Sequence, residues 1–414
     1  MAKSKLNKKS ISFILFDWAT SPLPTIHTTF IFSVYFINLI AIDNGTFVWG
    51  CIVGLAGILT AFFGPMIGSY SDKRGNRKFL LLLLTLLGFV STSLLWFARP
   101  GSEYLFFATI FSCISILSME LIYVLYNSLL SKTSTKNHAG EVSGYAWSAG
   151  YIGGMLSLII CLALFIFPEK LPFGIPKENG ADVRSCMLFI SFWLIIFCIP
   201  LFIYIEEPKQ NKTNKSTLIY IKEGLIKIYK SKNVLRYFVA RIFYFDGLAT
   251  LFAFGGIYAS KVFEFNKIEI LYFAIIINLA AALGAIFGGH LDDKFSPFKI
   301  IRLSLLGLII FGIILILNED KNLFWIISFF LGLFIGPLQS SSRVLITKII
   351  PEKKGAQFFG FAIFSGKITS FVGPLIYGSI VLLFESQKFG MIFVITLFII
   401  SLIILGNKEP NKIK

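Results

Sequence analysis

The stretch Phe79-Leu-Leu-Leu-Leu-Leu-Thr-Leu-Leu-Gly-Phe-Val-Ser-Thr-Ser-Leu-Leu-Trp-Phe-Ala98 carries no charged side chain. A helix needs about 20 predominantly apolar residues to cross roughly 30 Å of hydrocarbon, and this run is long enough. Because lipid offers the backbone no hydrogen-bond partners, such a segment must pair its own amides and carbonyls as a helix. The stretch therefore predicts a transmembrane helix.

Similar runs recur along the chain on both sides of this one. Apolar residues make up 56% of the 414 positions and charged residues only 14%, whereas soluble domains average roughly 45–50% and about 25%. The runs do not alternate with period two, which excludes barrel strands. We therefore predict an all-α polytopic membrane protein with twelve transmembrane helices, near residues 11–40, 48–70, 79–98, 104–130, 143–167, 184–205, 235–261, 268–290, 299–317, 322–349, 356–384 and 387–405.

Lysine and arginine side chains gather in alternate connecting segments, chiefly 71–78 and 206–236. Because such residues accumulate in cytoplasmic loops, the pattern predicts that both termini are cytoplasmic. The net charge of +16 follows from this bias, so no nucleic-acid partner is expected. Short loops favour the cell inner (plasma) membrane over an organelle, and the expected surroundings are a lipid bilayer.

Several other functions lack the residues that they would need. The apolar stretch after Met1–Ser10 is too long for a signal peptide and has no small-x-small cleavage site, which predicts an uncleaved first helix. The five cysteines have no paired spacing, the three histidines form no metal-ligand pattern, and no Gly-rich phosphate loop is present. We expect no catalytic residues, no metal, no cofactor and no enzyme activity.

The two parts of the chain resemble each other in sequence. The matched residues are Gly64/Gly284, Gly68/Gly288 and Asp72/Asp292 at an offset of 220, Lys132/Lys348, Gly144/Gly360, Ala146/Ala362 and Gly150/Gly366 at 216, and Phe16-Asp17/Phe245-Asp246 at 229. Three sets in the same order favour an internal duplication, although glycine in membrane helices often only permits close packing. We predict an N-terminal six-helix half (1–205), a cytoplasmic linker (206–234) and a C-terminal six-helix half (235–414), a recurring transporter design.

The loop after the second span carries a signature, Gly68-Ser-Tyr-Ser-Asp72-Lys73-Arg74-Gly75-Asn76-Arg77-Lys78. It resembles the loop between the second and third helices of the major facilitator superfamily. The resemblance implies the major facilitator fold, with two pseudo-symmetric six-helix halves, and a gating motif of Gly68, Asp72, Gly75 and Arg77 whose aspartate pairs across the cytoplasmic ends of the halves. The second copy, Gly288-Gly-His-Leu-Asp292-Asp293-Lys294, lacks the downstream glycine and is degenerate by that standard.

Further segments resemble the vacuole-effluxer-like, autophagy-related branch of the superfamily. They are Phe16-Asp17-Trp18-Ala19-Thr20-Ser21 with Thr29-Phe30-Ile31-Phe32, the stretch 246–258, the stretch Gln339-Ser-Ser-Ser-Arg343 and the stretch 365–374. Residue 20 is Thr where that branch usually has Asn. Fungal members in vacuoles are linked to amino-acid efflux toward the cytosol, so the resemblance implies amino acids as a substrate class.

Six ionisable residues fall inside the predicted spans, namely Asp17, Glu120, Arg241, Asp246, Arg343 and Lys367. A charge at the bilayer centre costs at least about 2.5–3.5 kcal/mol on insertion scales, so such residues normally face the protein interior and pair. From the rise of about 1.5 Å per residue, Glu120, Asp246 and Lys367 are expected at mid-membrane, and the other three nearer the cytoplasm. We expect Asp246 and Lys367 to share a cavity and to neutralise each other.

Each of these charges also has a purely structural interpretation. Asp17 could pair with Arg241 or Arg343, or cap a first helix that is broken near its prolines. Arg241 could snorkel to the interface. Glu120 could form a static bond between two helices.

The candidate substrate and coupling residues are Asp17, Thr20, Ser21, Glu120, Tyr126, Asn127, Asp246, Gln339, Arg343 and Lys367. The hydroxyls of Thr20 and Ser21 suit either substrate contact or interhelical hydrogen bonding. Tyr123, Tyr126 and Asn127 follow Glu120 along the same span and predict cavity lining.

Acids and bases in one central site suit a zwitterion better than a bare hydrocarbon. The sequence therefore predicts a monomeric secondary active transporter that moves a small polar or zwitterionic solute, with amino acids as the favoured class, by alternating access. A protonatable acid in the site would allow coupling to protons. The alternatives are an exporter of lipophilic drugs or metabolites, which the 46 Phe residues would fit, and a non-transporting membrane sensor or scaffold.

Overall fold

The computed structural model describes residues 6–135, 137–174, 176–207 and 216–413. The first α-helices are α1 (Lys8–Thr20), α2 (Phe32–Tyr35), α3 (Gly45–Arg74), α4 (Arg77–Leu94), α5 (Leu105–Asn127), α6 (Leu130–Thr133), α7 (Ala139–Cys161) and α8 (Ala181–Tyr204). After α9 (Thr217–Lys230) follow α10 (Lys232–Val262), α11 (Lys267–Lys294), α12 (Pro297–Leu317), α13 (Lys321–Ile349), α14 (Gly355–Lys367), α15 (Val372–Phe384) and α16 (Gln387–Leu405).

Within the described residues, twelve helical stretches are long and apolar enough to cross a membrane. They are Lys8–Ile40, Gly45–Arg74, Arg77–Phe97, Ser102–Asn127, Ala139–Ile166, Ala181–Tyr204, Lys232–Val262, Ile268–Lys294, Pro297–Leu317, Lys321–Ile349, Glu352–Phe384 and Gln387–Leu405. Each overlaps one span predicted from the sequence. The all-α, twelve-helix fold is therefore confirmed, with helix ends that differ by a few residues.

The helices form two groups, each with its own hydrophobic core. One core is built almost entirely from α1–α8 and the other from α9–α16. We call α1–α8 the N-terminal half and α10–α16 the C-terminal half. Both described chain ends lie at one end of the bundle, here named the termini end, where the amide of Ile413 donates to the carbonyl of Ile349 at 2.7 Å.

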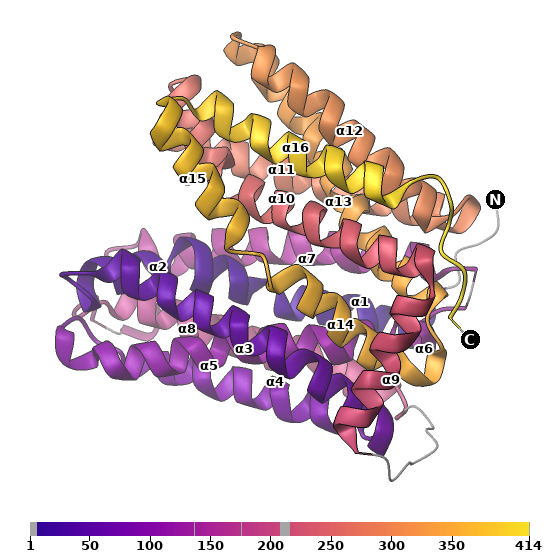
Figure 1. Cartoon of the computed structure of the whole chain (residues 1–414). Coiled ribbons are helices and arrows are strands. Elements are labelled where there is room, and N and C mark those ends of the chain that lie inside the picture. Colours follow the sequence, from indigo (N-terminus) through magenta and orange to yellow (C-terminus); the bar gives the residue numbers. More distant parts are fainter. Residues whose placement is uncertain (1–5, 136, 175, 208–215, 414) are drawn as a thin grey trace.

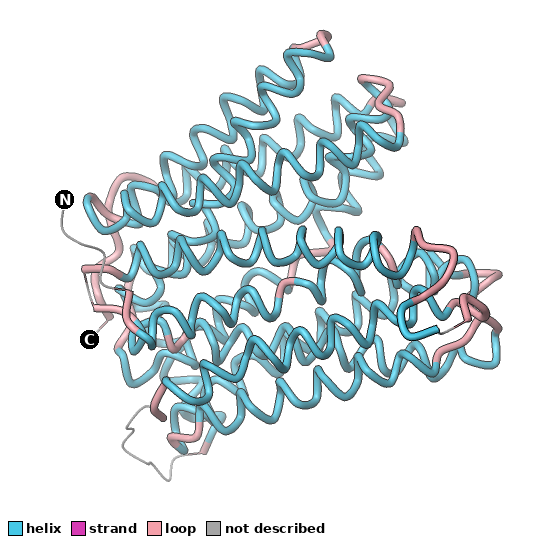
Figure 2. Tube along the Cα trace, turned by 180° about the vertical axis from the view of Figure 1, so that it is seen from behind, coloured by secondary structure: helices cyan, strands magenta, loops and turns pink. Residues whose placement is uncertain are grey.

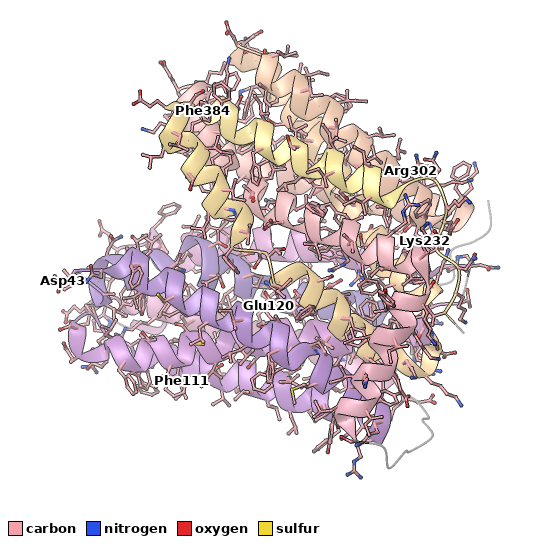
Figure 3. All side chains as sticks on the ribbon, in the orientation of Figure 1. Asp43, Phe111, Glu120, Lys232, Arg302 and Phe384 are labelled. Carbon is pink, nitrogen blue, oxygen red and sulfur yellow. The ribbon has the colours of Figure 1, made fainter. Side chains whose placement is uncertain are left out.

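The two halves converge at the termini end and diverge toward the opposite end, as the front and back views show (Figures 1 and 2). Asp43 of the N-terminal half and Phe384 of the C-terminal half lie at the separated ends (Figure 3). We call the termini end, where the halves converge, the closed side, and the opposite end, where they diverge, the open side.

Among the described residues, the most extensive contacts between the halves are those of α3 with α14 and of α7 with α11. A Cβ placed on Gly68 would overlap the carbonyl of Ala356, and one placed on Gly289 would overlap the carbonyl of Gly140. Because small residues let membrane helices approach closely, these glycines set the spacing of both pairs.

The two contacts also correct the repeat inferred from the sequence. The Gly68–Ala356 contact maps onto the Gly289–Gly140 contact when Gly68 is matched with Gly289, an offset of 221 residues. Gly140 is then matched with Ala356, an offset of 216 residues. The offset of 216 agrees with the sequence pattern. The offset of 220, which matched Gly68 with Gly288 and Asp72 with its counterpart, is one residue out of structural register.

Two of the spans are interrupted. In the first, α1 ends at Thr20 and the chain continues in a π-helical segment, Leu23–Phe30, where Pro24 removes one amide donor. In the eleventh, α14 ends at Lys367 and α15 begins at Val372. The Gly373-Pro374 pair of that span follows directly after the break, in the first turn of α15.

The segment between the halves contains a helix that the sequence did not predict. We expected a polar linker over 206–234, but α9 occupies Thr217–Lys230 and α10 already begins at Lys232. Residues 208–215 of the predicted linker lie outside the described residues. The sequence signal was missed because α9 is short and carries charges among its apolar residues.

Candidate functional site

A cavity lies between the two halves, on the open side of their contact. It has a volume of about 450 Å³ and is lined by polar and aromatic side chains from both halves, including Asp17, Ser21, Tyr123, Trp147, Tyr151, Asn278 and Gln339. It adjoins a lobe of about 550 Å³ at α10, α11 and α13, and Thr29 and Phe30 line both spaces. Three of the predicted site residues, Asp17, Ser21 and Gln339, therefore line this cavity.

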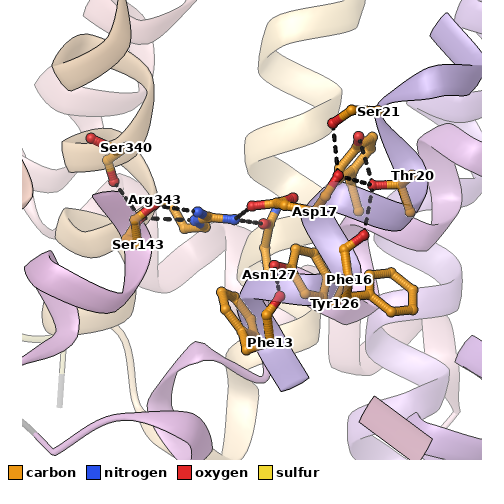
Figure 4. Close-up of polar contacts among 11 residues, drawn as sticks. Phe13, Phe16, Asp17, Thr20, Ser21, Tyr126, Asn127, Ser143, Ser340 and Arg343 are labelled. Carbon is orange, nitrogen blue, oxygen red and sulfur yellow. Dashed lines mark hydrogen bonds and ion pairs between the residues drawn. The ribbon is translucent and has the colours of Figure 1, made fainter. Parts of the chain in front are cut away.

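Asp17, in the cavity wall, belongs to an ion pair that joins the halves (Figure 4). The guanidinium of Arg343, on α13, lies 2.8 Å from the carboxylate of Asp17, on α1. It also donates to the Ser143 hydroxyl at 2.9 Å, to the Ser143 carbonyl at 2.8 Å and to the Asn127 side-chain oxygen at 3.3 Å. Arg343 thus crosses from its own half and bonds three helices of the other, and Arg343 rather than Arg241 is the partner of Asp17.

Aromatic rings surround this guanidinium. Its centre lies 5.2 Å from the ring of Phe13, 5.8 Å from Tyr126 and 5.6 Å from Trp147. Such contacts stabilise a partly desolvated cation. Tyr126 itself is fully buried, stacks on Phe13 and Phe16 and donates to the Phe13 carbonyl at 2.7 Å. Tyr126 therefore packs beside Arg343. Contrary to the prediction from the sequence, it does not line the cavity.

The neighbouring polar residues differ in how free they are to meet a solute. The hydroxyl of Ser21 donates to the Asp17 carbonyl at 2.7 Å, and that of Thr20 is held by carbonyls of its own helix and lies 3.2 Å from the Tyr123 hydroxyl. Tyr151 donates to the side-chain oxygen of Gln339 across the two halves. Thr20 is buried, so Ser21 is the one of the predicted hydroxyl pair that reaches the cavity.

A second ion pair crosses between the halves farther from the termini end. Lys367, the last residue of α14, lies 2.6 Å from Glu120 of α5, which Figure 3 places at the junction between the halves. The side chains retain 32% and 26% of their accessible surface, so the pair is only partly buried. A cation at a helix C-terminus also interacts favourably with the helix dipole.

This geometry corrects the predicted pairing of Asp246 with Lys367. Asp246 instead accepts a hydrogen bond from the Gly373 amide at 3.3 Å, in the first turn of α15. The two residues flank the break in the eleventh span, one beside the start of α15 and the other at the end of α14. Neither is among the residues that line the two spaces between the halves.

Arg241 is the remaining intramembrane charge. It is buried, donates to the Ala362 carbonyl and to the Ser365 hydroxyl, and stacks 3.8 Å from the Phe245 ring centre. The alternative in which it snorkels to the interface is therefore wrong. It holds α10 against α14.

The gating signature lies at the termini end and links α3 to α14. Asp72 accepts hydrogen bonds from the amides of Ala356 (3.3 Å) and Gln357 (2.8 Å) and pairs with Arg77. Those amides are the second and third of α14, which have no partner within the helix. Gly68 permits the close approach, and Gly75 adopts the left-handed conformation (φ 69°) that ends α3.

The other half provides an equivalent contact through a different residue than expected. Asp293, on α11, accepts hydrogen bonds from the amides of Gly140 (2.8 Å) and Glu141 (2.7 Å), the second and third residues of α7. Asp292, the residue matched to Asp72 by sequence, is buried and its carboxylate oxygens bond no other described residue. The second copy therefore keeps its contact between the halves, shifted by one residue.

Sequence reasoning missed several residues of the cavity wall. Trp147, Tyr151 and Asn278 line it without having been predicted, whereas Tyr123 was expected there and does line it. Asn278 could have been found as the lone amide in the apolar eighth span. The aromatic residues gave no such signal, because in this chain aromatic side chains also face lipid in large numbers.

Comparison with known proteins matches the chain to two family models. The one described as vacuole effluxer Atg22-like matches residues 131–408, and that of the Major Facilitator Superfamily matches residues 8–158. An uncharacterized MFS-type transporter of Bacillus subtilis, YxiO, is 23% identical over 97% of this chain and 95% of its own. Autophagy-related protein 22 of Cryptococcus neoformans is 22% identical over 68% of this chain and 54% of its own, so this chain spans about half of that relative.

Solved structures share the fold over almost the whole chain. The MFS transporter FucP in its outward conformation superposes with a TM-score of 0.74 at 12% identity, covering 96% of this chain and 97% of that one. The proton:xylose symporter XylE gives 0.73 at 13% identity, with 96% and 93% covered. The major facilitator fold implied by the signature loop is thereby confirmed.

Proposed function

We propose that this chain, which belongs to the vacuole effluxer Atg22-like family of the major facilitator superfamily and is a transporter rather than an enzyme, moves a small polar or zwitterionic solute. Amino acids are the favoured class. The observation that carries the proposal is the Asp17–Arg343 pair, in which Asp17 lines the cavity and the cation lies 2.8 Å behind it, at the contact between the halves. A zwitterion offers the complementary charges.

The pair suggests how solute binding opens the closed side. Arg343 bonds the N-terminal half through Asp17, Asn127 and Ser143, so it must leave those partners when the halves separate at the termini end. A bound carboxylate replaces Asp17 as the partner of Arg343, and a bound ammonium group replaces Arg343 as the partner of Asp17. The solute thus stabilises the charges that rocking of the halves would otherwise leave unpaired.

Protons are the proposed coupling ion. Protonation of Asp17 removes its charge and weakens its hold on Arg343, and Glu120 stands in the same relation to Lys367. Either acid would link the loss of a contact between the halves to the uptake of one proton. Transport by the parent protein should then acidify a weakly buffered vesicle lumen or medium in step with solute movement, and Asp17→Asn should abolish that linkage.

The proposed setting is the cell inner membrane, with a monomer whose termini face the cytoplasm, so that the conformation described here opens outward. Single cysteines at Lys353 and Lys177, in a background without native cysteines, test this arrangement. An impermeant reagent should label Lys177→Cys from outside and Lys353→Cys only after permeabilisation. Labelling of both from the same side would refute the topology.

The solute class is tested by ligand-induced thermal stabilisation of the purified protein with amino acids, sugars, nucleosides and lipophilic drugs. A ligand at about 100 times its Kd stabilises the folded state by about 2.7 kcal/mol. We expect stabilisation by an amino acid that is lost in Asp17→Asn and in Arg343→Met and kept in Lys299→Gln. Lys299 is exposed at the start of α12 and serves as the matched control.

Export of lipophilic compounds is the second candidate, because the lobe that adjoins the cavity is walled mainly by apolar side chains. Phe252, Phe273 and Phe324 contribute to it. Stabilisation by lipophilic compounds alone, unaffected by Asp17→Asn, would favour this function over the first.

A further inference from the structure

The linker helix α9 lies across the termini end of the bundle and runs crosswise to the spanning helices (Figure 1). One face packs on the gate. Tyr220, Gly224 and Ile228 are buried, the carbonyl of Tyr220 accepts from the side-chain amide of Gln357 at 2.7 Å, and a Cβ on Gly224 would lie 2.8 Å from the Phe361 ring. Spacing by four residues puts these contacts on one side of the helix.

The remaining faces of α9 expose apolar side chains. Leu218, Ile219, Leu225, Ile226 and Tyr229 are all exposed, from 41% for Ile226 to 77% for Tyr229. Ser231 alone separates α9 from α10, which spans the membrane from Lys232. The apolar faces therefore end at the membrane boundary, where amphipathic helices bury such faces among headgroups and acyl chains.

Basic side chains accompany these faces. Lys222 and Lys230 lie on α9 and are exposed. A surface pocket of about 630 Å³ at the α9–α10 junction is lined by Lys230, Lys232, Arg236 and Lys408, and its lining includes no acidic residue. Basic pockets beside membrane helices suit anionic lipid headgroups.

We propose that α9 is an interfacial helix that docks on anionic phospholipid, with its exposed apolar faces in the lipid boundary and the basic pocket on a headgroup phosphate. Charge complementarity selects this occupant, because the pocket offers cations and amides without a competing acid. The docking also reaches the gate. Gln357 donates from its side chain to the carbonyl of Tyr220 in α9, and from its backbone N–H to the carboxylate of Asp72 in α3. An α9 anchored to lipid therefore holds α14 in the position where Asp72 caps it.

The test places an environment-sensitive fluorophore on Ile226→Cys of the full chain, in a background without the five native cysteines. The detergent-solubilised protein is titrated with phosphatidylglycerol, with phosphatidylcholine and with inorganic phosphate. We expect a saturable blue shift with phosphatidylglycerol alone. An exposed lysine near an anionic surface strengthens binding about fivefold, so Lys230→Gln with Lys232→Gln should raise the half-saturating concentration about 25-fold.

The matched control is Lys294→Gln with Lys299→Gln, two exposed lysines at the same end of the bundle. It should leave the half-saturating concentration unchanged. Thermal unfolding of each variant shows whether it remains folded, and quenching by spin-labelled lipid measures insertion independently. The proposal is overturned if phosphatidylglycerol gives no shift, if phosphatidylcholine gives the same shift, or if inorganic phosphate reproduces it, since the last would indicate a site for free phosphate.

Discussion

Replacing Arg343 by Met should separate the energetic role of the central ion pair from that of its surroundings. The substitution keeps an apolar stem of similar length but removes every donor to Asp17, Asn127 and Ser143. Breaking a buried pair typically costs about 3–5 kcal/mol. Because Asp17 lines the cavity and can be reached by water, we expect a loss at the lower end, about 3 kcal/mol.

The reciprocal change, Asp17→Asn, should cost less. The guanidinium of Arg343 keeps its bonds to the hydroxyl and carbonyl of Ser143, and the new amide oxygen can still accept, so we expect about 2 kcal/mol. The double variant carries no unpaired charge and should also lose only about 2 kcal/mol. The resulting coupling energy of about 3 kcal/mol lies at the upper end for residues in contact.

The measurement is equilibrium unfolding in mixed detergent micelles for the two single variants and the double variant. Lys299→Met combined with Asp17→Asn provides the control cycle, which should be additive within about 0.5 kcal/mol because Lys299 is exposed on another helix. Additive losses for the Asp17 and Arg343 pair would refute the inference that the two side chains meet in the folded protein.

Three further outcomes follow, the first two from contacts between the halves and the third from the contact of α9 with α14. Asp72→Asn and Asp293→Asn should each weaken a helix cap worth about 0.5–2 kcal/mol. Each should also raise the rate at which a cysteine in the cavity is labelled from the termini end, and the double variant should raise it most. Labelling of the double variant at the parent rate would contradict the inference that the two caps close this end. Lys367→Met should destabilise by only about 1 kcal/mol in the same unfolding assay, because its pair with Glu120 is about a third exposed, and a second change, Glu120→Gln, should add almost nothing. Gly224→Leu should lift α9 from α14, because its Cβ would already lie 2.8 Å from the neighbouring side chains; unchanged proteolysis of the linker would argue against that contact.

The spans could be predicted because lipid offers no hydrogen-bond partners, so every residue of a spanning helix must pair its backbone groups within the helix. The partners of the buried charges could not. Counting residues gives the depth of Glu120, Asp246 and Lys367 along the membrane normal, and all three were expected at one level. Which two meet depends on the direction each faces and on which helices are neighbours, and α5 rather than α10 presents the acid to Lys367.

The repeat was found from sequence, but its 220-residue offset is one residue out of register, again because sequence does not give the direction that each side chain faces. Tandem aspartates, Asp292 and Asp293, allow two alignments with Asp72, and the glycines at 288 and 289 do not decide between them. Successive residues on a helix differ in direction by about 100°. Only the contact with α7 shows that Asp293 is the one that faces the other half.

The position of the two caps bears on how such a molecule can open at its closed end. Asp72 and Asp293 bond helix N-termini at the membrane boundary, so on separation both the acids and the freed amides meet water rather than lipid. Each contact can therefore be released at a cost of about 0.5–2 kcal/mol. The Asp17–Arg343 pair lies deeper and Arg343 is not among the residues that line the cavity, so under the proposed function the solute supplies the replacement partners. A shift of the two conformations from about 1:99 to 99:1 requires about 5.5 kcal/mol of differential binding, more than either cap contributes. A zwitterion that replaces both members of the central pair is thus the kind of solute that can supply the largest share of that difference, and the boundary caps set how far the resting equilibrium lies toward the closed end.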